Sequence, residues 1–257
     1  MAWDPRQYLN FADHRLRPAV DLITRIPVSE PTEIVDLGCG PGNVTQLLAN
    51  RWPDAAITGV DSSRKMLQHA CAEHPGFGWQ VADIGDWTAR KPVELLFSNA
   101  ALHWLPDHET LFPRLIEQVS PGGIMAIQMP RNFDRPTHRL VEDAARETGV
   151  FDRLSPLFRP APTHPPHFYY DLLSPYAAGL DIWETDYLQV LEGNNPVMEW
   201  TRGTWLRQFL EVLEDDPTAQ QRFLDCYRDL TAQAYPKQQN GKTLLPFLRL
   251  FILVRRK

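Results

Sequence analysis

The sequence contains few cysteines, and none of them falls in a recognisable pattern. Cys39, Cys71 and Cys226 are the three among 257 residues, and they lie far apart. Their number and spacing favour neither a disulfide framework nor the paired cysteines of a zinc site. We therefore expect a core that is built without cross-links or a metal ion, which a chain of this length can bury.

Long hydrophobic runs and an excess of basic residues are also missing. The longest apolar run, Leu244–Val254, is too short to span a bilayer and is interrupted by Pro246 and Arg249. The opening residues Met1–Asn10 are polar and aromatic, unlike a targeting leader. The formal charge of -6 argues against a general nucleic-acid binder, although a few local arginines can still hold a small anion. We expect a cytoplasmic protein without a nucleic-acid or membrane partner, and its oligomeric state stays open.

Short apolar runs alternate with amphipathic patterns along the first half of the chain. Strands separated by helices in this rhythm predict βαβ units, a buried and mainly parallel sheet, and right-handed crossovers. A Pro-Gly-Gly turn at Pro121–Gly123 is expected between the last helix of this half and the strand after it. We expect strands at Glu33–Leu37, Ala56–Val60, Gly78–Ala82, Glu94–Ser98 and Ile124–Met129, and helices at Asp13–Ile26, Asn43–Arg51, Ser63–His74 (with Ser62 as N-cap) and Asp107–Val119.

The rhythm changes after Met129. The proline- and aromatic-rich stretch Asp152–Pro175 predicts little regular structure. We expect further helices at Thr137–Thr148, Thr204–Leu213 and Thr218–Ala234, and further strands at Asp181–Leu191 and Leu244–Arg255. The whole pattern indicates an α/β fold: a Rossmann-like, seven-stranded, mostly parallel sheet with helices on both faces and a helical insertion.

The strongest local signal is a glycine-rich turn between the first expected strand and the next helix. Gly38, Gly40 and Gly42 are spaced G-x-G-x-G, and Asp36 precedes them. Glycines allow a tight turn and let the backbone approach a ligand closely. A dinucleotide-binding loop would have its third glycine one position later, at Asn43, to hold a diphosphate. The acidic residue instead suits a ligand with a positive charge.

Three more polar residues follow successive expected strands, namely Asp61, Asp83 and Asn99. Open α/β sheets bind ligands beyond the carboxyl ends of their strands, where a carboxylate at Asp61 can accept both hydroxyls of a ribose. Asp83 follows the next strand, where an adenine amino group can be bound. Taken singly, the glycine-rich segment can be only a tight turn, and each aspartate can be only a helix cap, without any ligand. Taken together, the four features predict a nucleoside-binding edge.

These segments resemble the class I S-adenosylmethionine (SAM)-dependent methyltransferases. Asp36–Gly42 matches the glycine motif of that class, Gly59–Ser63 its ribose motif and Ala82–Ile84 its adenine motif. Asn99–Leu105 matches the motif after the fourth strand, and Pro121–Gly123 precedes the fifth. The resemblance implies SAM as the cofactor, bound by Asp36, Gly38, Gly40, Gly42, Asp61, Ser62, Asp83, Ile84 and Asn99. It also implies a single class I methyltransferase domain over 1–257, with a SAM-binding core at 31–130 and helical or loop insertions at 131–180 and 192–240 that form the acceptor side.

A closer likeness extends over most of the chain. The segments Trp3–Phe11, Arg15–Leu22, Gln128–Asn132 and Leu244–Phe251 are similar to the trans-aconitate 2-methyltransferase family. The likeness implies transfer of a methyl group from SAM to one carboxylate of a small polycarboxylic acid, most simply trans-aconitate, to give a monomethyl ester. The family offers no diagnostic catalytic residue to carry across.

Methylation of a carboxylate makes modest demands on a protein. The acceptor is ionised at neutral pH, because a carboxyl pKa lies near ~4, so no general base is obligatory. The guanidinium group of an arginine can bind each of the acceptor's remaining carboxylates through two hydrogen bonds. Arg131, directly after the fifth expected strand, is the favoured residue for this contact. His103 and Trp104 are the other acceptor-binding candidates, His103 being equally compatible with a structural role.

Two aromatic segments are weaker candidates for covering the site. Phe168, Tyr169 and Tyr170 are candidates for a lid, and Trp3 and Tyr8 for a cover over the cofactor. Each set is also explained by packing alone, as a surface loop in the first case and as a helix against the sheet edge in the second.

Three other functions remain compatible with the sequence. One is methylation of a carboxylate on another acceptor, such as a malonyl carrier protein, which needs a basic docking face. Another is methylation of carbon or oxygen on a different small molecule, with His103 as the base. The third is a SAM-binding regulatory protein without catalysis.

Overall fold

The computed structural model describes residues 16–28, 30–161, 163–203 and 205–257. The chain forms two compact units. The first contains the residues up to Pro130 together with Pro162–Glu184 and Arg249–Lys257, and the second contains Arg131–Ala161 and Thr185–Leu248. Trp3 and Tyr8, predicted above to cover the cofactor, lie outside the described residues.

A seven-stranded sheet has the order β3-β2-β1-β4-β5-β7-β6. Pairings among β1 to β5 are parallel, and β7 runs antiparallel to β5. The order reverses between β1 and β4, which is where open α/β sheets bind ligands. The strands are β1 Glu33–Leu37, β2 Ala56–Asp61, β3 Gly78–Val81, β4 Val93–Asn99, β5 Val119–Pro130, β6 Ala177–Leu191 and β7 Thr243–Arg256. The predicted fold class is confirmed.

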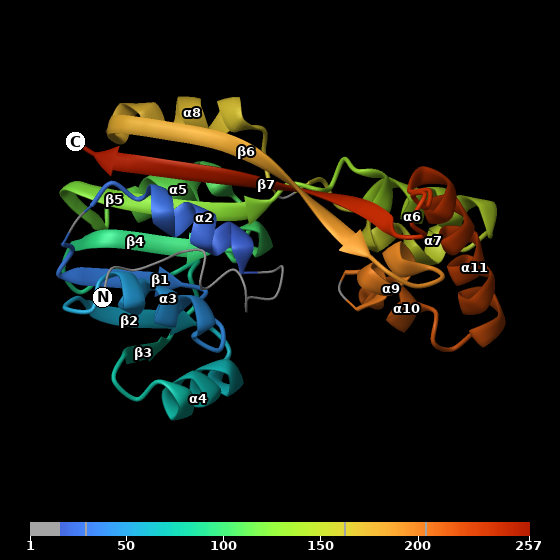
Figure 1. Cartoon of the computed structure of the whole chain (residues 1–257), viewed down its shortest axis with the longest axis horizontal. Helices are drawn as coiled ribbons and strands as arrows, with labels where there is room; N and C mark the ends of the chain where they lie inside the picture. The colour runs from blue at the N-terminus through green and yellow to red at the C-terminus, as the bar shows by residue number, and fades with distance from the viewer. Residues whose placement is uncertain (1–15, 29, 162, 204) are drawn as a thin grey trace. The chain divides into compact units, whose positions relative to one another are not determined.

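Helices cover both faces of the sheet in the first unit. In Figure 1, α2 and α3 lie in front of the strands and α5 lies behind β5. Contacts join α2 to β5 and to α3, whereas α5 contacts β5 and α8. The face under α5 and α8 is a continuous apolar core that contains Met125, Ile127 and Met129 of β5. The elements are α2 Arg17–Arg25, α3 Asn43–Arg51, α4 Arg64–Glu73, α5 His108–Ile116, α8 Pro166–Leu173 and the 3-10 turns η1 Leu102–Trp104 and η3 Ser174–Tyr176.

The second unit is helical and has its own core. Its main contact is between α6 and α11, where Phe223 and Tyr227 are fully buried. The Tyr227 hydroxyl donates to the Thr137 carbonyl at 2.9 Å, so the one polar atom of this buried ring is satisfied. The elements are α6 Pro136–Glu147, α7 Phe151–Leu154, η2 Ser155–Leu157, α9 Pro196–Arg202, α10 Arg207–Val212 and α11 Pro217–Ala234.

The structure differs from the sequence analysis in four local features. The stretch 152–175 contains α8 and short helical turns, and Tyr169 of α8 is fully buried in the core, which excludes it from a mobile lid. Helix α9 was not predicted. Pro121–Gly123 lies inside β5, where the pairing with β4 shifts register between Val93 and Leu95. The N-cap of α4 is Ser63, not Ser62.

Among the described helices, none has both the length and the apolar composition needed to cross a membrane.

Candidate active site

The glycine loop after β1 packs tightly against the segment that follows β4. Gly38 has a φ of +73°, and its N–H and that of Cys39 both donate to the Val60 carbonyl. A Cβ on Gly38 would lie 2.2 Å from the Cβ of Ala101. Only glycine fits this position, because both its backbone conformation and its space exclude a side chain. The loop is thereby fixed between the ends of β2 and β4.

Gly40 and Gly42 differ in what surrounds them. Gly40 has a φ of +55° and open space where a side chain would be, so its backbone can be approached by a ligand. Gly42, with a φ of +88°, begins helix α3 and lies against Trp79, which a Cβ would approach to 2.8 Å. The first N–H groups of a helix have no acceptor within it, and those of α3 follow the loop directly.

Asp61 connects the glycine loop to the end of β2. Its carboxylate accepts from the Gly40 N–H at 2.9 Å and from the Ser63 N–H at 2.8 Å. The side chain is half-buried, whereas Ser62 beside it is exposed. Each carboxylate oxygen can accept a further hydrogen bond, so these contacts leave room for ligand hydroxyls.

Asp36 places a buried carboxyl group at the base of the loop. It is 1% exposed and accepts one hydrogen bond, from the Thr45 hydroxyl at 2.7 Å. Burial raises the pKa of Asp36 to about 7. The hydrogen bond from Thr45 lowers this pKa, and the nearby charge of Asp61 raises it further. Burial and the same two carboxylates also raise the pKa of the Cys39 thiol. An anion would be repelled here, and a positive ligand group would relieve the repulsion between the carboxylates.

The segment after β3 is anchored by Arg114, a residue that the sequence analysis missed. Asp83 is exposed and accepts from the Gly85 N–H at 2.7 Å, while Ile84 is buried and reaches the position beside Gly38. Arg114 of α5 donates to the carbonyls of Ile84, Gly85 and Trp87. A helix arginine carries no sequence signal for such a role, because the carbonyls it binds come from a distant loop.

Unpartnered polar atoms gather where β4 and β5 end. Asn99 and Gln128 are register partners on these strands. The Asn99 Oδ1, both amide atoms of Gln128 and the Nδ1 of His103 are buried without a hydrogen-bond partner among the described residues. Burial, the positive charge of Arg249 and His108 lower the pKa of His103 to about 3, so its ring is neutral. Buried polar groups of this kind call for a ligand or water.

The remaining acceptor candidates have different surroundings. Trp104 is 77% exposed and its ring lies 4.6 Å from that of His103. Arg131 belongs to the second unit, where its guanidinium lies 3.7 Å from the Asp134 carboxylate and its N–H donates to the Leu248 carbonyl.

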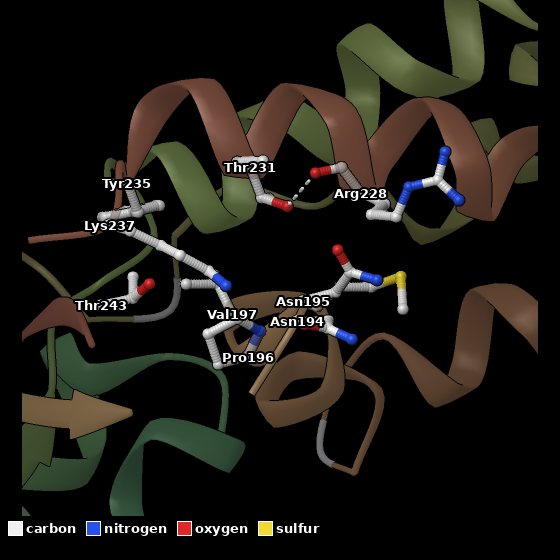
Figure 2. Close-up of a pocket in the computed structure, with 11 residues that line it drawn as sticks. Asn194, Asn195, Pro196, Val197, Arg228, Thr231, Tyr235, Lys237 and Thr243 are labelled. Atoms are coloured by element: carbon white, nitrogen blue, oxygen red, sulfur yellow. Dashed lines mark hydrogen bonds between the residues drawn. The ribbon is translucent and has the colours of Figure 1, made fainter. Parts of the chain in front are cut away.

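A pocket in the second unit contains none of the predicted site residues. Figure 2 shows it between Asn195 and Pro196 on one side and Arg228 and Thr231 of α11 on the other. The Thr231 hydroxyl donates to the Arg228 carbonyl at 3.0 Å, and the Arg228 guanidinium pairs with two aspartates of its own helix. The side chains of Arg228 and Thr231 are therefore already engaged within their own helix.

Comparisons with known proteins define the class. Residues 34–123 match the family model described as a methyltransferase domain. Among solved structures, a phosphoethanolamine N-methyltransferase from Haemonchus contortus, bound to S-adenosylhomocysteine, aligns with a TM-score of 0.55 and 15% identity over 94% of this chain and 53% of its own. The plantazolicin methyltransferase BpumL aligns with a TM-score of 0.51 and 14% identity over 98% and 89%. The protein is thus a SAM-dependent methyltransferase with the class I fold.

Full-length relatives define the family. The trans-aconitate 2-methyltransferase of Azoarcus sp. is 45% identical over 99% of both chains. That of Methylobacterium nodulans is 46% identical over 99% of this chain and 98% of its own, and that of Escherichia fergusonii 43% over 99% and 98%. The chain belongs to the trans-aconitate 2-methyltransferase family, as the sequence analysis predicted.

Proposed function

We propose that this protein transfers the methyl group of SAM to one carboxylate of trans-aconitate and releases the monomethyl ester. The observation that carries the proposal is the relatives' shared name at 45% and 46% identity over 99% of this chain. The carboxyl groups of Asp36 and Asp61 support the donor half of the reaction, because SAM presents an ammonium and a sulfonium.

We assign SAM to the glycine loop and the strand ends around it. The open backbone at Gly40 and the carboxylates of Asp36 and Asp61 fit a cationic nucleoside and disfavour a diphosphate. The bound cofactor supplies an activated methyl group. Further binding residues in this assignment are Gly38, Gly42, Ser62, Asp83, Ile84 and Asn99.

The protein has no need of a base for this reaction. A carboxylate acceptor is already ionised at neutral pH. His103, whose pKa is lowered to about 3, is a weak base, which argues against the alternative of oxygen or carbon methylation with His103 as the base. Holding the acceptor oxygen in line with the methyl group is then the main task, and such orientation can lower a barrier by ~7–11 kcal/mol.

Labelled SAM incubated with a panel of polycarboxylates tests the proposal. We expect label to transfer to trans-aconitate and the product to release it on mild base treatment, as an ester does. Transfer to a carrier protein alone would favour the docking alternative, and a base-stable product would favour carbon or ether methylation. Tight SAM binding without any turnover would favour a regulatory protein.

The acceptor-side assignments stay predictions. They comprise the clamp at Arg131, the contacts of Trp104, and the division of one domain into a core at 31–130 and acceptor-side insertions at 131–180 and 192–240. A cytoplasmic location also stays a prediction.

A further inference from the structure

One face of the sheet carries a polar group of side chains at the ends of three neighbouring strands. Asn99 of β4 pairs with Gln128 of β5, Gln128 with Phe251 of β7, and Pro130 with Arg249 of β7. Paired residues point to the same face, and so do residues two apart on one strand. Asn99, Gln128 and Arg249 therefore share a face, opposite the face on which Met129 and Leu250 enter the apolar core.

Gln128 is the most unusual member of this group. It is 1% exposed, and neither its amide nitrogen nor its amide oxygen has a hydrogen-bond partner among the described residues. Phe251 beside it stacks on Trp183 with ring centroids 4.8 Å apart, so the amide stands next to an aromatic wall. A buried amide with both ends unpartnered calls for a ligand or water, and an aromatic wall beside it is typical of small-molecule sites.

His103 brings this group next to the cofactor loop. It lies in the turn η1, which contacts β5, and it is two residues from Ala101, whose Cβ limits Gly38. Its Nδ1 is a second buried polar atom without a partner in the described part of the chain. A group bound by His103 and Gln128 therefore lies at the cofactor end of the sheet.

Arg249 supplies the charge that a carboxylate requires. It is half-buried, and its positive charge acts on the His103 ring. A guanidinium, an amide N–H and a neutral imidazole N–H together offer the donors that a carboxylate accepts, and a charged donor makes the strongest of these bonds. All three residues belong to the first unit.

We propose that Arg249, Gln128 and His103 form a carboxylate-binding subsite that holds the acceptor of the methyl transfer. The subsite rests on the proposed function and adds to it residues of β5 and β7 that determine specificity for a polycarboxylate. It binds one carboxylate of the acceptor through the Arg249 guanidinium and through hydrogen bonds from Gln128 and His103.

The test compares Arg249→Gln and Gln128→Leu with a matched control on the same strand, Arg255→Gln. Arg255 is exposed and donates to the carbonyls of Gly122 and Pro27 at 3.3 and 3.4 Å. We expect Arg249→Gln to raise the KM for trans-aconitate ~10–100-fold, as the loss of a charged hydrogen bond does, and to leave the Kd for S-adenosylhomocysteine within about twofold.

Gln128→Leu should raise the KM for trans-aconitate by a smaller factor, and Arg255→Gln should change neither the KM nor the Kd. Circular dichroism melting checks that each variant folds, and Arg249→Lys, which keeps the charge, should recover part of the loss.

Acceptors that lack one carboxylate separate a direct contact from an indirect one. Among dicarboxylate analogues that each lack a different carboxylate, the one without the carboxylate bound by Arg249 should lose less on Arg249→Gln than trans-aconitate does. Equal KM changes in Arg249→Gln and Arg255→Gln, or a parallel loss of S-adenosylhomocysteine binding, would overturn the subsite while leaving the methyl transfer intact. If the wild type methylates no polycarboxylate, the proposed function fails. Calorimetric titration of trans-aconitate into the wild type loaded with S-adenosylhomocysteine then tests whether the subsite exists. Binding of trans-aconitate to the wild type that is lost in Arg249→Gln would support the subsite. Absence of binding to the wild type would refute the subsite.

Discussion

At the scale of single residues, the candidate site is defined by polar side chains in apolar surroundings. Asp36, Asp61 and Asn99 were predicted from sequence, because they follow or precede strand ends and match a known motif. Gln128 and Arg249 were missed, although each interrupts an apolar strand run and such an interruption is a usable signal. What the sequence could not supply is the register of β7 against β5, which places Arg249 opposite Pro130.

Asp61→Asn should weaken cofactor binding by ~10-fold or more. The asparagine keeps one oxygen for the Gly40 or Ser63 N–H but loses the charge and one acceptor site. Calorimetry with S-adenosylhomocysteine measures the effect, and Asp54→Asn, an exposed residue before β2, serves as control. An unchanged Kd would remove Asp61 from the proposed ribose contact.

The affinity for SAM should rise with pH and level off about one pH unit above 7. The pKa of Asp36 is raised from 3.8 to about 7 in the folded protein, so its carboxyl is mostly protonated below that pH and attracts a cation only when ionised. Binding should release a proton near pH 6.5, which calorimetry detects as a dependence on buffer ionisation enthalpy. In Asp36→Asn the pH dependence should disappear. Proton release that persists in this variant would assign it to another group.

The same shift makes a prediction for the stability of the ligand-free protein. Between pH 4 and 7 the folded protein holds a proton on Asp36 that the unfolded chain has lost, so the contribution of this group to the free energy of unfolding falls as the pH rises through that range. The full span is on the order of 4 kcal/mol. Urea unfolding at pH 5 and pH 8 measures the larger part of this span, and Asp36→Asn should flatten the difference. An equal difference in both proteins would contradict this account.

At the scale of elements, the sequence predicted the strands well and some helices poorly, and proline explains the errors. The stretch 152–175 was expected to be irregular because proline breaks helix interiors. Pro166 instead occupies the first turn of α8, and Pro196 does the same in the unpredicted helix α9. In the first turn the missing N–H costs nothing and the fixed φ favours the helix. The tertiary position of a proline-initiated helix cannot be deduced from composition.

Gly38→Ala should destabilise the protein far more than Gly122→Ala. Both glycines have positive φ, at +73° and +78°, and an alanine pays roughly 1–2 kcal/mol for that conformation. Only at Gly38 does the new Cβ also meet another side chain, at 2.2 Å from Ala101. Denaturant unfolding should show a loss of ~3 kcal/mol or more for Gly38→Ala, with weaker cofactor binding. Similar losses in the two variants would mean that the loop can move away from β4.

At the scale of the whole molecule, the fold class followed from the alternation of strands and helices, whereas the division into two compact units did not. Two of the four boundaries fall inside β6 and β7, each of which contributes residues to both units. No break in composition marks these points, because a strand that continues past a boundary keeps its apolar pattern.

Bound S-adenosylhomocysteine should slow hydrogen exchange in the first unit only. The proposed cofactor contacts all lie in its described residues, around 36–42, 61–63, 83–87 and 99, whereas the pair α6 and α11 has a separate core. Mass spectrometry of exchanged peptides, with and without the ligand, measures this effect. Protection of α11 equal to that of the glycine loop would contradict the assignment of the cofactor to the first unit.

The position of β7 also constrains the order of assembly. This strand comes last among the seven along the sequence, yet it lies between β5 and β6. The edge strand β6 thus has no neighbour in the sheet until a segment more than fifty residues later has been inserted beside it. Such non-local pairing slows folding, and we expect refolding to end with this insertion. Because Arg249 lies on the inserted strand, a folding intermediate without it would contain the glycine loop but not the acceptor subsite, and competence to bind the nucleoside would precede competence to methylate.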